Sequence, residues 1–235
     1  MSWLDGGLHF FGFAVCHTLP SRTLALGGRY LPVCARCSGI YLGVAAAYLY
    51  LLARRGFKVN ALPRLGVSLA LVATLLPLAV DGVTSYAGLR ASNNVIRLVT
   101  GLLAGGALPL FAFPLLSPDL VEEERGKKAV RPFGPWYDYL IWAGAVAAVG
   151  ALALWGWPPL YYPLAILAVA GLAAIFYNLA LVIWLMVFER ARRRSRAWPY
   201  VLAAASVLAV FALLNLFHYY TFRALLNATG GKLPA

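Results

Sequence analysis

The stretch CARCSGIYLGVAAAYLYLLA, residues 34–53, joins a pair of cysteines to a long apolar segment. A helix needs roughly 20 apolar residues to cross the hydrocarbon core of a bilayer. The apolar part of the stretch, 38–53, is short for this purpose unless Val33 to Cys37 extend it. We therefore predict a membrane-spanning helix that carries cysteines at its beginning.

The composition extends this prediction to the whole chain. Hydrophobic residues make up 62% of the 235 residues and charged residues 12%, whereas a soluble domain is about 25% charged. These values indicate an all-α, polytopic integral membrane protein with about six transmembrane helices. The expected spans are approximately 38–53, 65–82, 95–116, 137–157, 160–188 and 200–222. Pro77, Pro109 and Pro114 are expected to kink these spans or mark their ends.

Residues 3–15 are apolar but too short to cross, so we expect a short N-terminal interfacial or re-entrant helix there.

The formal charge of +12 is concentrated in alternate connections between the expected spans. Of the 20 Lys and Arg residues, 13 lie in the connections 54–64, 125–131 and 190–196. Cytoplasmic loops carry the Lys and Arg excess of membrane proteins, so we assign these three connections to the cytoplasm. The protein is then a multi-pass cell-membrane protein whose cysteines face the extracytoplasmic side. The same distribution argues against nucleic acid as a partner and favours membrane lipid.

The segment 117–135 divides the chain by its composition. It combines prolines with a dense run of mixed charge, a pattern typical of a linker. We predict a Cys/His-bearing membrane core over 1–116, a charged cytoplasmic linker over 117–135 and a second three-span bundle over 136–235. Small residues also recur at helical spacing, which favours close helix packing and a homo-oligomer through small-residue helix faces. The pairs are Gly39 with Gly43, Gly101 with Gly105, and Gly144 with Ala148.

All three cysteines lie within the first 37 residues and define a candidate metal site. Cys34 and Cys37 have the C-x-x-C spacing that lets two thiolates bind one ion, and Cys16 with His17 completes a Cys₃His set. We predict zinc, or iron, at these four residues. Because adjacent residues rarely both ligate one ion, His17 is alternatively a catalytic neighbour, and the fourth position is open to water or another side chain. The candidates for that position are Asp81, His9 and His218.

The same cysteines fit two other chemistries. A C-x-x-C pair on an extracytoplasmic face is typical of thiol–disulfide exchange, and Arg36 between the thiols would lower a thiol pKa. Cys16 would then act as the resolving thiol, and a quinone within the bundle would accept the electrons. The odd number of cysteines leaves one thiol outside a single disulfide. A structural disulfide between Cys16 and one of the pair is the third interpretation.

A second polar cluster surrounds the connection between the second and third spans. Asp81 ends one span, and Ser92, an N-cap candidate, opens the next. Asn93 and Arg97 follow at helical spacing on one face, and a helix N-terminus beside an arginine is suited to bind an anion. We assign catalysis to Asp81, Asn93 and Arg97, and substrate binding to Arg22, Arg36 and Ser92. The alternative is that Asp81 and Arg97 only neutralise each other near the membrane.

These motifs together resemble a known family. The pattern is Cys16-His17, the block Pro32 to Gly43, Asp81-Gly82, and Ser92-Asn93 followed by Arg97 and Thr100-Gly101. It is similar to the prokaryotic membrane family called domain of unknown function 2085, over roughly residues 10–110. The resemblance implies a small multi-span membrane protein with a cysteine and histidine site, and it implies no activity. Residues 136–235 lie outside it.

Three functions are compatible with these features. The first is a metal-dependent hydrolase or transferase that acts on a lipid or a lipid-linked phosphate. The second is a membrane thiol–disulfide oxidoreductase that uses the Cys34/Cys37 pair. The third is a lipid or ion carrier whose metal site is structural. The sequence contains no nucleotide-binding loop and no Ser/His/Asp order that would name the reaction.

Overall fold

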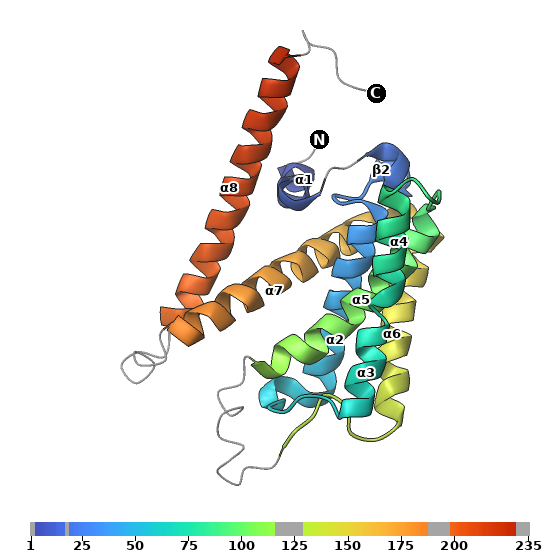
Figure 1. The fold of residues 1–235 in the computed structure, drawn as a ribbon, viewed down its shortest axis with the longest axis vertical. Coiled ribbons are helices and arrows are strands. Elements are labelled where there is room, and N and C mark those ends of the chain that lie inside the picture. Colours follow the sequence, from blue (N-terminus) through green and yellow to red (C-terminus); the bar gives the residue numbers. More distant parts are fainter. Residues whose placement is uncertain (1–2, 17–18, 116–128, 188–197, 229–235) are drawn as a thin grey trace.

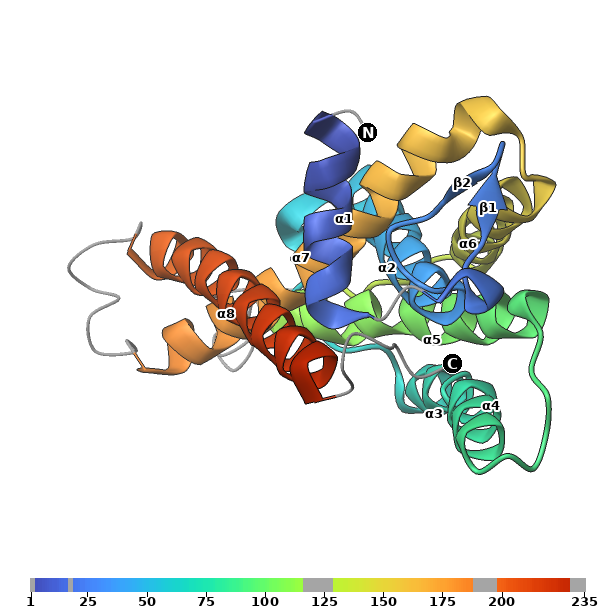
Figure 2. The same ribbon diagram turned by 90° about the horizontal axis from the view of Figure 1, so that it is seen from above.

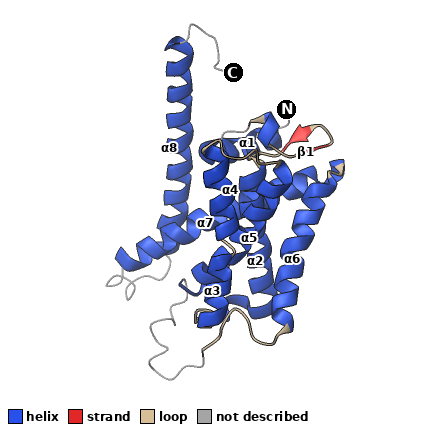
Figure 3. Ribbon diagram, turned by 45° about the vertical axis from the view of Figure 1, so that its right-hand side comes forward, coloured by secondary structure: helices blue, strands red, loops and turns tan. Residues whose placement is uncertain are grey.

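The computed structural model describes residues 3–16, 19–115, 129–187 and 198–228, which form an all-α structure with one small hairpin (Figure 3). The helices are α1 (Trp3–Val15), α2 (Ala35–Arg55), α3 (Leu65–Ala73), α4 (Leu76–Tyr86), α5 (Asn94–Leu115), α6 (Tyr137–Trp155), α7 (Tyr161–Val187) and α8 (Trp198–Ala228). The connecting elements are the 3₁₀ turns η1 (Pro20–Arg22), η2 (Gly56–Lys58) and η5 (Pro158–Leu160), and the strands β1 (Ala25–Leu26) and β2 (Arg29–Tyr30). Six helical segments of the described residues are long and apolar enough to cross a membrane. The predicted polytopic fold is therefore confirmed.

The second predicted span is interrupted near its middle. α3 ends at Ala73, and α4 begins at Leu76, directly before Pro77. A proline has no N–H to donate, and its ring clashes with the carbonyl four residues earlier, which here belongs to Ala73. The span therefore consists of two helices in series. Pro109 and Pro114 instead lie inside α5, which continues through both of them.

The N-terminal apolar segment forms α1 over the predicted residues 3–15. α1 lies beside α7 and α8 at one end of the molecule (Figure 2). The Asn215 side-chain amide of α8 donates to the Phe10 carbonyl over 3.1 Å, which ties α8 to α1. With 13 residues α1 is too short to cross a bilayer, and its interfacial or re-entrant placement stays a prediction.

α2 is the central helix of the structure and packs against α5, α6 and α7 (Figure 1). Its contact with α5 uses two of the predicted glycine pairs. A side-chain carbon at Gly43 would lie 2.7 Å from the Leu102 carbonyl oxygen, and one at Gly101 would lie 2.9 Å from the Ile40 nitrogen. Because glycine has no Cβ, the two backbones approach each other directly. This contact brings the beginnings of α2 and α5 side by side.

The third small-residue pair lies on an open face of α6. Gly144 and Ala148 are exposed, and nothing among the described residues lies within 4 Å of a side-chain carbon built at Gly144. The other two pairs, Gly39 with Gly43 and Gly101 with Gly105, are buried against each other in the contact between α2 and α5. A homo-oligomer through small-residue helix faces stays a proposal.

The helices that follow the predicted linker pack onto those that precede it. α6 and α7 both contact α2, and the Trp142 indole N–H donates to the Gly106 carbonyl over 3.0 Å. Linker residues 117–128 lie outside the described residues, whereas the Tyr50 hydroxyl of α2 donates to the Pro132 carbonyl over 3.0 Å. The division into a core, a linker and a second bundle stays a prediction.

A buried carboxylate holds the end of α2 that is remote from the cysteines. Asp138 accepts hydrogen bonds from Arg54 over 2.9 Å, from Arg55, and from the Gly134 N–H over 2.9 Å. The basic residues of the connection after α2 lie at this same end. The cysteines and the basic connection are therefore at opposite ends of α2, as the predicted topology requires. The compartment that each end faces stays a prediction.

The hairpin formed by β1 and β2 was not among the predicted elements. Gly27 and Gly28 have φ angles of 56° and 80°, the left-handed conformation that a two-residue I′ turn requires at both positions. The Gly-Gly pair between Leu26 and Arg29 is the signal that could have identified this turn. The hairpin contributes Leu26 and Leu31 to the buried core and directs the chain into α2.

Candidate metal centre

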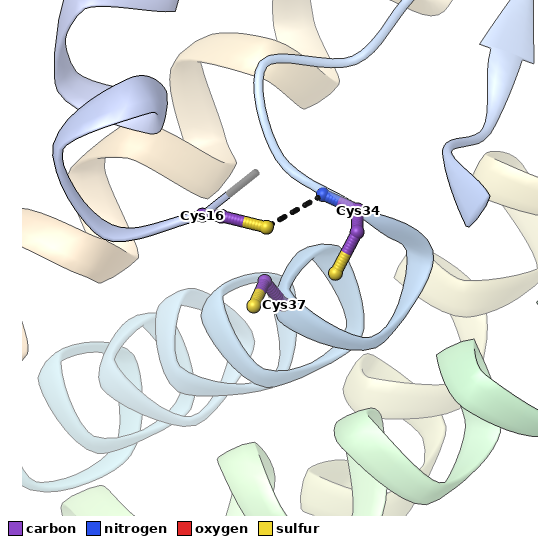
Figure 4. A group of neighbouring side chains, drawn as sticks. All are labelled: Cys16, Cys34 and Cys37. Carbon is purple, nitrogen blue, oxygen red and sulfur yellow. Dashed lines mark hydrogen bonds between the residues drawn. The ribbon is translucent and has the colours of Figure 1, made fainter. Parts of the chain in front are cut away.

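Three cysteine thiols converge at the beginning of α2. Cys16 directly follows α1, Cys34 is the residue before the first turn of α2, and Cys37 lies within that turn. Their sulfur atoms all lie within 4.8 Å of one another (Figure 4). The Cys34 backbone N–H also donates to the Cys16 sulfur over 3.4 Å. Residues three apart at a helix N-terminus face the same side, so the C-x-x-C spacing brings two thiols together and the fold supplies the third.

The three cysteines form no disulfide with one another in this structure, and they are partly or fully buried. The thiol of Cys34 is hydrogen-bonded by the other two cysteines and by the N–H groups at the start of α2. These contacts, led by the one with Cys16, lower the pKa of Cys34 to about 2. The same contact with Cys34 is the main cause that raises the pKa of Cys16 to about 11. The contacts with Cys16 and Cys34 also raise the pKa of Cys37, so without a bound ion the group favours one thiolate, on Cys34, and two protonated thiols.

The donor set fits a soft or borderline divalent cation. Zn–S bonds of about 2.3 Å in a tetrahedral site place sulfur atoms roughly 3.8 Å apart, and the three sulfur atoms here all lie within 4.8 Å of one another. His17, the predicted fourth ligand, lies outside the described residues. Of the other candidates for that position, neither Asp81, His9 nor His218 joins the thiol group in the described part of the chain. The structure thus brings together three thiols that could hold an ion, and the bound metal and its fourth ligand stay predictions.

The Asp81 carboxylate organises a second group of side chains at the same end. Its Oδ2 accepts from Arg36 over 2.5 Å, and its Oδ1 accepts from Arg90 over 2.7 Å and from the Ser92 hydroxyl over 2.5 Å. Asp81 is only 1% exposed. Asp81 forms no ion pair with Arg97 in the described part of the chain, because Arg36 and Arg90 occupy its carboxylate. Arg90 was not among the predicted site residues, although its place in the short connection after Asp81 indicates a cation near that carboxylate.

The N-cap of α5 is Asn93, which corrects the assignment of that role to Ser92. The Asn93 side-chain oxygen accepts the Ile96 N–H over 2.8 Å, the bond that defines an N-cap. Ser92 instead donates to Asp81. Asn93 is exposed and has a structural task, and its predicted catalytic role stays a prediction.

Arg97 lies in the first turn of α5, at the same end of the molecule as the thiols and the Asp81 group. It is 8% exposed, and no acidic side chain among the described residues forms an ion pair with it. The charges of Arg22, Arg36, Asp81 and Cys34 all act on its guanidinium. The Nε of Arg36 is also buried without a hydrogen-bond partner in the described part of the chain. The charges of the predicted binding residues Arg22 and Arg36 thus act on the predicted catalytic residue Arg97 at this end of the molecule.

The fold and this site define a polytopic α-helical membrane protein with a cysteine triad at the start of its central span. The chain belongs to the family described as predicted membrane protein (DUF2085), which matches residues 16–111. This confirms the family resemblance. An uncharacterised protein of Methanothermobacter thermautotrophicus is 41% identical over 91 residues, which cover 39% of this chain and 78% of the relative.

A second relative, an uncharacterised protein of Methanocaldococcus jannaschii, is 36% identical over 104 residues. This match covers 43% of the chain and 63% of the relative, so the chain spans less than two thirds of that protein. No solved structure is significantly similar to the chain. The family match contains the three cysteines, Asp81 and Arg97, and it ends before α6.

Proposed function

We propose that the protein is a metal-dependent membrane enzyme that acts on the phosphate of a lipid or lipid-linked substrate. The observation that carries this proposal is a buried cation, Arg97, that has no ion pair among the described residues and lies at the same end of the molecule as three convergent thiols. Zinc, or iron, is the ion that these thiols would hold. The extracytoplasmic placement of the site is part of the proposal and rests on the charge of the opposite loops.

The side chains at this site have separate roles in the proposed reaction. Arg97, with Arg22 and the unpartnered Nε of Arg36, supplies positive charge for a phosphate oxygen. Asp81 fixes Arg36 and Arg90, so these guanidinium groups need not reorganise when substrate binds. A metal ion bound at the thiols with an open position would supply a water of lowered pKa or polarise a phosphoryl oxygen.

The metal prediction is tested by measuring bound metal per chain in protein purified in detergent without chelator. We expect about one zinc or iron per chain in the wild type, and loss of that metal in Cys34→Ser and Cys37→Ser because two thiolates cannot replace the three-sulfur set. Arg97→Gln is the matched control and should retain the metal. Full metal content in Cys34→Ser, or none in the wild type, would refute the metal site.

The role of Arg97 is tested by phosphate release from phosphatidic acid and from a polyprenyl diphosphate. Loss of one preorganised donor typically costs a factor of about 100 or more in turnover, and we expect this loss in Arg97→Gln with metal content unchanged. Arg97→Lys should recover part of it, since the charge remains while the planar fork is lost. Arg29→Gln, an exposed change at the same end, should leave turnover intact. Equal turnover in Arg97→Gln and Arg29→Gln would contradict the assignment.

A second candidate is a thiol–disulfide oxidoreductase, and the position of the C-x-x-C pair at a helix N-terminus favours it. In the direction that delivers electrons to a quinone, a Cys34–Cys37 disulfide would oxidise a substrate dithiol. One substrate thiolate would attack the Cys34 sulfur and displace the Cys37 thiolate, and the second substrate thiolate would displace Cys34 as the substrate disulfide forms. Cys16 lies close enough to both thiols to take part in the exchange. This candidate gains support if purified protein holds no metal and Cys37→Ser traps a covalent adduct. Lipid binding without any product would instead favour a carrier.

A further inference from the structure

A cavity of about 510 Å³ lies at the basic end of the molecule, remote from the thiols. Arg55 at the end of α2, Arg64 before α3, and Arg131 in the segment leading to α6 all line it. These three arginines come from separate parts of the sequence, so the fold assembles the cavity. Its apolar lining includes Val67 and Phe133.

The positive charge around this cavity is not neutralised by the carboxylate nearby. Asp138 is shared between Arg54 and Arg55, and it also accepts the Gly134 N–H. No acidic side chain in the described ranges pairs with Arg64 or Arg131. Among the described residues, four arginines at this end therefore face one carboxylate, and Arg64 and Arg131, which have no ion pair there, both line the cavity.

The N-terminus of α3 adds backbone donors to the same place. The first intrahelical bond of α3 runs from the Ser68 N–H to the Arg64 carbonyl, so the N–H groups of Leu65, Gly66 and Val67 have no acceptor within the helix. Arg64 occupies the N-cap position and makes no side-chain cap bond. Free N–H groups and the positive end of a helix dipole attract an anion.

We propose that this cavity binds a phosphate-bearing anion through Arg64, Arg131 and the start of α3. Arginine binds phosphate with two parallel N–H bonds, and two arginines on different segments can hold one phosphate group from two sides. The cavity lies at the ends of membrane-spanning helices and has apolar walls at Val67 and Phe133. A lipid headgroup is therefore one source of the anion, and a soluble phosphate compound is the other. The site is independent of the proposed enzyme site, which lies at the other end of α2.

The lipid source is tested by native mass spectrometry of the full chain released from nanodiscs that contain equal amounts of phosphatidylglycerol and phosphatidylcholine. We expect retained phosphatidylglycerol in the wild type, and about tenfold less in Arg64→Gln and in Arg131→Gln because each removes a charge-assisted contact. Lys58→Gln is the matched control, since Lys58 is an exposed cation of the same connection that does not line the cavity. It should retain the lipid at the wild-type level.

The soluble source is tested by the thermal stability of the detergent-purified protein in inorganic phosphate against chloride at equal ionic strength. Stabilisation by phosphate that disappears in Arg64→Gln and Arg131→Gln, together with no preference for phosphatidylglycerol, assigns the site to a soluble anion. The proposal is overturned if Arg64→Gln and Arg131→Gln match Lys58→Gln with both probes. It is also overturned if the wild type prefers neither probe. All variants change exposed side chains, and size-exclusion profiles check that each one is folded.

Discussion

Replacing Gly105 by leucine is expected to prevent α2 and α5 from packing and to abolish the folded state. A side-chain carbon at this position would lie 2.7 Å from the carbonyl carbon and 2.8 Å from the Cα of Ile40. These atoms belong to the backbone of α2, so no change of rotamer can relieve the overlap. Overpacking against side chains costs about 1–3 kcal/mol, and we expect a larger cost here because a whole helix must move.

The measurement is the melting temperature and the monodisperse yield of the variant in detergent. Gly144→Leu is the matched control, since it introduces the same side chain into a span where nothing described lies within 4 Å. Gly144→Leu should melt within a few degrees of the wild type, whereas Gly105→Leu should give little folded protein. Similar melting temperatures for the two variants would contradict the direct backbone contact.

Asp138→Asn is expected to produce the second largest effect, by removing the charge that two arginines share. Asp138 is 0% exposed, and the side chains of Arg54 and Arg55 are 35% and 21% exposed. Breaking a fully buried pair costs about 3–5 kcal/mol because a charge is left uncompensated. Water reaches both arginines here, so we expect a smaller loss of about 2 kcal/mol in the free energy of unfolding.

A double-mutant cycle separates this contact from a general effect of charge. Asp138→Asn combined with Arg55→Gln should destabilise less than the sum of the two single changes, because each single change already breaks the pair. Asp138→Asn combined with Arg64→Gln should be additive, since Arg64 does not contact Asp138 in this structure. Additivity in both combinations would show that the pair does not stabilise the fold.

Most of the helical architecture was predictable from local features of the sequence. The lengths of the apolar runs located the six spans, because a span is set by the hydropathy of neighbouring residues. Pro77 indicated the break between α3 and α4, because a proline disrupts the helix within the turn that precedes it. The hairpin at Gly27 and Gly28 was missed although its signal is also local. The choice between Ser92 and Asn93 as the N-cap was wrong because the two residues have similar intrinsic preferences, and the pairing of Ser92 with Asp81 decided between them.

The candidate site was predictable in composition but not in pairing. The C-x-x-C spacing placed Cys34 and Cys37 on one turn. The partner of Asp81 was not predictable, since Arg36, Arg90 and Arg97 are all within reach of a carboxylate at this end. The tertiary structure decided it, by bringing Arg36 of α2 to Asp81 of α4.

The sequence by itself determined that this protein is a helical membrane protein, that its spans fall at these positions, and that a cysteine pair begins the first of them. These properties depend on hydropathy and on spacing along one chain segment. The tertiary structure alone decided that Cys16 converges with that pair and that the basic cavity assembles. It also decided that Arg97 forms no ion pair among the described residues. Each depends on residues that are distant in sequence, and only the close approach of the α2 and α5 backbones and the packing around them set those distances.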